Sequence, residues 1–160
     1  MDLGALSPNS PEFDTLDRVI QAWLQERQAL IVALNHLINL RPFPVPTVVK
    51  PTLTEFCACL VDYASKGQFE VFEKIFEASH LENSKEFNRN SLIRLFQSTL
   101  KAVDFHDKYM KATTYSELEG DLSALSEALA GRLESEDELI TLYMSATHTL
   151  SPKRSRQSFL

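Results

Sequence analysis

The stretch FCACLVDYASKGQFEVFE, residues 56–73, decides how this chain folds, because two helical patterns meet in it at a glycine. Upstream of Gly67, an apolar stripe with the spacing of a helix face runs as far as Ala64. Downstream, Phe69 and Phe72 recur at helical spacing. Glycine adopts without strain the left-handed conformation that commonly ends a helix. We therefore expect one helix to end at Gly67 and a second helix to begin after a sharp corner.

Helical periodicity continues through most of the remaining chain, and strand-like alternation is hard to find. The expected helices cover about residues 14–39, 52–66, 68–80, 91–112 and 115–147, the second of them starting with a capping box at Thr52. The two short central helices together match the length of each long one. The pattern therefore predicts an all-α, antiparallel four-helix bundle in which one member is broken into two short helices at Gly67.

The bundle is expected to form one domain over residues 14–148. Residues 1–13 are rich in Pro, Ser and Asn and lack periodicity, which indicates a disordered arm or a remnant of cloning. Residues 149–160 follow the last apolar stripe, and we expect them to form a flexible basic tail.

The charge of the chain argues against direct binding to nucleic acid. The net charge is −6, and the last ten residues hold three basic and no acidic side chains, so the rest of the chain carries −9. Such a body repels phosphates and favours a basic protein partner. No apolar run reaches the roughly 18–20 residues that a membrane span needs. Cys57 and Cys59 lie two residues apart on a predicted helix, cannot easily bridge, and indicate reduced thiols in a cytoplasmic protein.

The interior is expected to be apolar with one polar intrusion. The predicted core includes Trp23, Leu30, Leu60, Phe72, Leu100, Leu125 and Leu129. Arg27 interrupts the apolar stripe of the first helix, and an unpaired buried guanidinium is very costly. We therefore expect Arg27 to be at least half buried and paired with Glu136 or Asp137 of the last helix.

Motifs of catalysis are not apparent in the sequence. It lacks a glycine-rich phosphate loop, a nucleophile elbow and a Cys–His constellation, so we expect neither an enzyme nor a bound cofactor. Two alternatives to a specific regulator stay open. One is a ferritin-like metal-binding bundle, for which residues 77–80 supply a single Glu-x-x-His motif. The other is a helical adaptor for an unrelated protein partner.

The motif F-C-x-x-L-V-D-Y-x-S-x-G-x-F-x-x-x-E in residues 56–73 resembles the signature of the Rsd/AlgQ family of bacterial anti-sigma factors. Residues 23–30 and 122–140 resemble further segments of that family, and the order and spacing hold over nearly the whole chain. Two positions depart from the family pattern, because Gln68 stands where His is usual and Ser126 where Gly is usual.

The resemblance implies a protein that binds the C-terminal DNA-binding domain of the housekeeping sigma factor and blocks its contacts with promoter DNA and core polymerase. Some relatives also bind the phosphocarrier HPr, which makes HPr a second candidate partner. The resemblance further implies that Asp62, Ser65 and Phe69 form the partner-facing ridge. Periodicity alone also allows Phe69 to point into the core with the other aromatic residues.

Overall fold

The computed structural model describes residues 11–80 and 87–147. The helices are α1 (Pro11–Ile38), α2 (Pro46–Lys66), the π-helical segment η2 (Gly67–Phe72), α3 (Glu73–Ala78), α4 (Arg89–Lys111) and α5 (Leu118–Thr147). Residues 11–13, expected to belong to a disordered arm, instead form the first turn of α1. The rest of the expected arm, residues 1–10, lies outside the described residues. The expected basic tail also lies outside them, because the structure does not describe residues 148–160.

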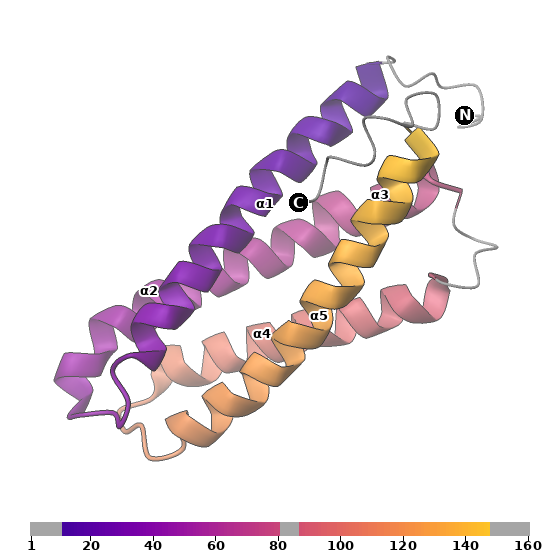
Figure 1. Ribbon diagram of the computed structural model, residues 1–160. Helices are drawn as coiled ribbons and strands as arrows, with labels where there is room; N and C mark the ends of the chain where they lie inside the picture. Colours follow the sequence, from indigo (N-terminus) through magenta and orange to yellow (C-terminus); the bar gives the residue numbers. More distant parts are fainter. Residues whose placement is uncertain (1–10, 81–86, 148–160) are drawn as a thin grey trace.

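The described helices form an all-α bundle, as predicted (Figure 1). The segments α2, η2 and α3 follow one another without a loop and act as one long member beside α1, α4 and α5. In this bundle α1 packs on α2, α2 on α4 and α4 on α5, while α3 contacts α5. Short connections at residues 39–45 and 112–117 make the helices that they join antiparallel.

The break at Gly67 differs from the predicted corner. Gly67 has right-handed helical dihedral angles, φ −56° and ψ −49°, and the chain passes through it into η2. Glycine is needed here for space: a Cβ atom would lie 2.9 Å from Cζ of Phe72, 3.0 Å from Nη2 of Arg132 and 3.0 Å from Nε1 of Trp23. The prediction of a left-handed helix end was therefore wrong, because close packing and not backbone conformation requires glycine.

The second helix begins earlier than its capping-box pattern predicts. It starts at Pro46 with Val45 as the N-cap residue, and Thr52 lies inside the helix. Proline suits the first helical position, because the amide hydrogen it lacks would have no partner inside the helix. Pro51 also lies inside α2, although proline removes one helical hydrogen bond there. Pro46 thus opens the helix, six residues before the start that the capping box predicted.

The core forms around large aromatic side chains. Trp23 stacks on Tyr63 with ring centroids 5.9 Å apart and meets Phe72 edge-on at 5.6 Å, and all three are fully buried. Of the seven predicted core residues, Trp23, Leu30, Leu60, Phe72, Leu125 and Leu129 are buried. Leu100 is 46% exposed, so its predicted burial was wrong.

The error at Leu100 has its origin in the rotation of α4. Two parallel stripes run along this helix, and the one that turns inward contains Leu95, Thr99 and Ala102. The neighbouring apolar stripe, which includes Phe96 and Leu100, is about half exposed. Thr99 faces the interior because its hydroxyl accepts a hydrogen bond from Arg132 of α5 at 2.7 Å. A buried polar contact therefore sets the orientation that hydrophobic spacing alone left ambiguous.

Candidate functional site

A ridge on the outer side of α2 and η2 carries the three residues predicted to face a partner. Asp62 is exposed and Ser65 is partly buried, while Phe69 exposes 76% of its surface. All three line one open depression of about 330 Å³, which we call the Phe69 hollow. Its other lining residues are Glu26, Val61, Lys66 and Glu70. The structure therefore brings the three predicted ridge residues together on one surface.

Phe69 is the most exposed of the large hydrophobic residues that the structure describes. Val71 and Phe72, which follow two and three residues after Phe69, are fully buried. The alternative in which Phe69 points inward with the other aromatic residues of this segment is therefore excluded. An exposed aromatic ring beside carboxylates is typical of the residues that dominate protein–protein binding energy.

A separate polar cluster joins α1 to α5. Nη1 of Arg27 donates to Oδ1 of Asp137 at 2.7 Å and lies 3.7 Å from Oε1 of Glu136. The Arg27 side chain is 16% exposed. Burial opposes its charge, but the hydrogen bond and charge of Asp137, together with Glu136, raise the pKa of Arg27 above its ordinary value. The structure thus places Arg27, Glu136 and Asp137 side by side.

Arg132 lies at the centre of this cluster, although sequence reasoning did not select it as a site residue. Its buried guanidinium donates to Oε2 of Glu136 at 2.8 Å and to the Thr99 and Ser98 hydroxyls at 2.7 and 3.0 Å. Nη2 also donates to the Ala64 carbonyl oxygen at 3.2 Å. The signal that could have identified it is an arginine four residues before Glu136 on the inner face of the last helix.

Glu136 is fully buried and accepts hydrogen bonds from both sides. The Tyr63 hydroxyl donates to Oε1, and Arg132 donates to Oε2. Burial raises the pKa of Glu136, whereas Arg132 and the Tyr63 hydrogen bond act in the opposite direction. Burial and the Glu136 charge also raise the pKa of Tyr63. Through these contacts, every long member of the bundle is tied to Arg132 or Glu136.

The cluster also reaches the element that carries Phe69. The Thr99 hydroxyl donates a hydrogen bond to Oε1 of Gln68 at 3.1 Å. The Arg132 guanidinium lies 5.0 Å from the centre of the Phe72 ring on the same segment. Both contacts hold η2 from the inside. The polar cluster therefore positions the ridge, while the ridge itself stays open to a partner.

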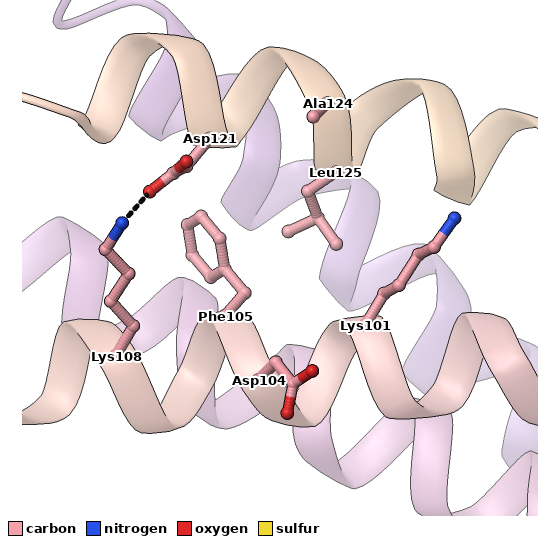
Figure 2. A pocket seen from close by; sticks show the side chains of 7 residues that line it. All are labelled: Lys101, Asp104, Phe105, Lys108, Asp121, Ala124 and Leu125. Carbon is pink, nitrogen blue, oxygen red and sulfur yellow. Dashed lines mark hydrogen bonds and ion pairs between the residues drawn. The ribbon is translucent and has the colours of Figure 1, made fainter.

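A second depression lies between α4 and α5 (Figure 2). It has a volume of about 290 Å³ and is lined by Lys101, Asp104, Phe105, Lys108, Asp121, Ala124 and Leu125. Lys108 closes one side, because its Nζ lies 2.6 Å from Oδ2 of Asp121. The Tyr109 hydroxyl donates to the same oxygen at 2.5 Å. None of its lining residues belongs to the site predicted from the sequence.

Metal-binding clusters and membrane-spanning helices are absent from the part of the chain that the structure describes. Over residues 11–80 and 87–147, no group of three or more His, Cys, Asp or Glu side chains is placed to hold a metal ion. Among the same residues, no helix combines the length and the apolar character that crossing a lipid bilayer requires.

An open hollow with an exposed phenylalanine, on a bundle whose buried Arg132 and Glu136 bind each other, has the features of a protein-binding helical module. Residues 6–144 match the family described as "Regulator of RNA polymerase sigma(70) subunit, Rsd/AlgQ", and the chain belongs to this family.

Curated relatives carry the name "Regulator of sigma D". Those of Escherichia coli strain K12 / DH10B, Escherichia coli O139:H28 and Shigella boydii serotype 18 are each 30% identical over 144 residues. The matched region covers 85% of this chain and 90% of each relative. No solved structure is significantly similar to the chain.

Proposed function

We propose that this protein is an anti-sigma factor that binds the C-terminal DNA-binding domain of the housekeeping sigma factor. The bound domain would lose its contacts with promoter DNA and with core RNA polymerase. The mechanism is competitive sequestration, so the effect depends on the concentration of the protein and involves no chemical step. Because transcription takes place in the cytoplasm, the proposal also locates the protein there.

The observation that carries this proposal is the exposed Phe69 on an acidic ridge of a chain from the sigma(70)-regulator family. Phe69 supplies an apolar anchor of the kind that concentrates binding energy in interfaces. Asp62 supplies a carboxylate that can pair with an arginine or lysine which otherwise contacts a DNA phosphate. Ser65 is small enough to let a helix of the partner approach the ridge.

The proposal is tested by titrating the purified sigma C-terminal domain into wild-type protein and into variants by isothermal calorimetry. Phe69→Ala should weaken binding by about 2 kcal/mol, which is typical for an interface hot spot. Phe69→Ala combined with Asp62→Ala should abolish measurable binding. Phe96→Ala is the matched control, because Phe96 is a half-exposed phenylalanine on α4 that does not line the Phe69 hollow.

Melting temperature and circular dichroism separate binding from folding. Since Phe69 is 76% exposed, its replacement should leave both near the wild-type values. Normal sigma binding by the double variant would place the interface elsewhere. Equal losses in Phe69→Ala and Phe96→Ala would also contradict the proposed ridge. A parallel titration with HPr tests the second partner that the family resemblance implies.

A further inference from the structure

A hollow between α4 and the middle of α5 contains cations as its only charged lining residues. It has a volume of about 330 Å³, and the cations that line it are Arg94, Lys101 and Arg132. No described aspartate or glutamate lines it, although the whole chain has a net charge of −6. We call this site the Arg94 hollow. Such a local excess of positive charge on an acidic protein favours an anionic occupant.

The two cations at the rim, Arg94 and Lys101, have no acidic partner in the described part of the chain. Both residues are exposed, and neither forms an ion pair with a described residue. Arg94 donates one hydrogen bond, from Nη2 to the Ser91 hydroxyl at 3.1 Å. Figure 2 shows Lys101 extending from α4 toward α5, away from the pair of Lys108 and Asp121. The charges of both rim cations can therefore be used by a ligand.

Arg132 adds a fixed charge behind the rim. Its side chain is fully buried, and its partner Glu136, 2.8 Å from Nε, does not line the hollow. The buried pair therefore presents its positive end to the hollow. Nη1 of Arg132 donates to the Ser98 hydroxyl at 3.0 Å, and this hydroxyl donates to the Leu95 carbonyl oxygen at 2.6 Å. Because buried charges are screened less than exposed ones, Arg132 strengthens the attraction for an anion.

The wall that α5 contributes is low and carries a free hydrogen-bond donor. Ala128, Gly131 and Ser135 share one face of α5, since they are three and four residues apart, and all three line the hollow. A Cβ atom added at Gly131 would meet nothing within 4 Å. The Ser135 hydroxyl forms no hydrogen bond with the described residues. The hollow therefore offers open space and a neutral donor beside its charges.

The size and the surroundings of the hollow favour a small phosphorylated molecule over a nucleic acid. Its volume lies near the lower end of the range of about 300–1,000 Å³ that is usual for small-molecule sites. A phosphate monoester brings close to two negative charges and three acceptor oxygens, which Arg94, Lys101 and Ser135 can satisfy together. A nucleic acid would bring many further phosphates against an acidic protein that repels them.

An apolar surface for the rest of such a molecule lies next to the hollow. Lys101 also lines the depression of Figure 2, whose other lining residues include Phe105, Ala124 and Leu125. We propose that the Arg94 hollow binds the phosphate group of a small phosphorylated organic molecule, whose organic part lies in this depression. The site belongs to α4 and α5, whereas the ridge at Phe69 belongs to α2 and η2, so the inference does not depend on the proposed function.

The site is tested with phenyl phosphate, which carries a phosphate monoester and a small apolar ring. It is titrated into the full-length protein while backbone amide signals are followed by NMR, with inorganic phosphate and phenol as control ligands. Phenyl phosphate should shift the signals of Ser98, Lys101, Gly131 and Ser135 in a saturable way. Inorganic phosphate should bind about threefold more weakly or worse, because it makes no apolar contact. Phenol should not shift these signals.

A variant that places a carboxylate in the hollow tests its position. Gly131→Glu should raise the Kd for phenyl phosphate about tenfold or more, because like charges repel. Gly120→Glu is the matched control, since Gly120 also lies in α5 and a Cβ there meets nothing within 4 Å, but it does not line the hollow. Glutamate favours a helix more than glycine does, so neither variant should lower the melting temperature.

Removal of the rim cations gives an independent measure. Arg94→Met combined with Lys101→Met should also raise Kd about tenfold or more, because two charge-assisted contacts are lost. Lys50→Met is the control, since Lys50 is an exposed lysine of α2 that does not line the hollow. Equal losses in the site variants and their controls would overturn the proposal.

The titrations of the wild-type protein decide the matter even if a variant unfolds. Saturable binding of phenyl phosphate that exceeds the binding of both control ligands and maps to the hollow would support the proposal. No saturable binding, equal affinity for inorganic phosphate, or shifts confined to other parts of the bundle would overturn it.

Discussion

Replacement of Gly67 by alanine has two opposing effects on the stability of the fold. Gly67 has right-handed helical dihedral angles, so helix propensity alone favours alanine by about 0.5–1 kcal/mol. The added Cβ, however, would lie within 3.0 Å of atoms of Phe72, Arg132 and Trp23. These side chains come from η2, α5 and α1, and Arg132 cannot shift without disturbing its hydrogen bonds to Glu136 and α4.

Steric overlap should therefore decide the sign of the effect. Overpacking a tight core costs about 1–3 kcal/mol, which exceeds the gain in propensity. We expect Gly67→Ala to lower the free energy of unfolding by about 1–2 kcal/mol. Gly131→Ala is the matched control, because Gly131 lies inside α5 and a Cβ added there would meet no neighbouring side chain within 4 Å. That change should raise the free energy of unfolding by about 0.5–1 kcal/mol.

Urea unfolding followed by circular dichroism at equal protein concentration measures both variants. An increase in stability for Gly67→Ala similar to that of Gly131→Ala would refute the packing argument. Gly67→Asn adds a second criterion, because asparagine is tolerated at a left-handed helix end. In the observed right-handed conformation the larger side chain should be more destabilising than alanine, and a milder effect would favour the left-handed corner.

Three further predictions concern the polar and thiol groups. Glu136→Gln should lower the free energy of unfolding by about 3–5 kcal/mol in urea titrations, because it leaves the buried Arg132 without its carboxylate, and a loss below about 1 kcal/mol would contradict this role. Cys57 should resist labelling by a thiol reagent at pH 8 until the protein is unfolded, since burial raises its pKa to about 12. The hydrogen bond from Lys108 lowers the pKa of Asp121, so the stability this group adds is present above pH ~4 and lost as pH falls through its folded-state pKa. The difference in melting temperature between wild type and Asp121→Asn should therefore shrink below pH ~4, and a constant difference down to about pH 2 would argue against the ion pair.

The helical bundle could be predicted from the sequence because apolar spacing is a local property of each segment. The long stripes of α1 and α5 contain enough repeats to define an inner face, and buried residues such as Trp23 and Leu125 follow from them. The same reasoning failed on α4, where two neighbouring stripes have similar apolar content. There the choice depends on the contact of Thr99 with Arg132, two residues 33 positions apart.

The candidate site was predictable in part for a similar reason. The resemblance to the family signature selected Asp62, Ser65 and Phe69, which lie within one short stretch of sequence. Glu26 reaches the same hollow from another helix, so no local pattern places it there. The reason for glycine at position 67 could not be predicted either, because it depends on three side chains that only the folded bundle brings together there.

The π-helical segment has a consequence for how the length of this chain can vary. A π-helical turn contains one residue more than an α-helical turn. Deleting one residue from η2 would restore an α-helical turn and leave α3 in its present orientation, because the wide turn takes up its extra residue without rotating the helix that follows. Within η2 itself, the deletion would redistribute side chains between the outside and the inside, so the exposure of Phe69 and the burial of Val71 and Phe72 depend on the extra residue. The π-helical turn therefore sets which side chains of this segment face outward, while the helices on either side keep their register.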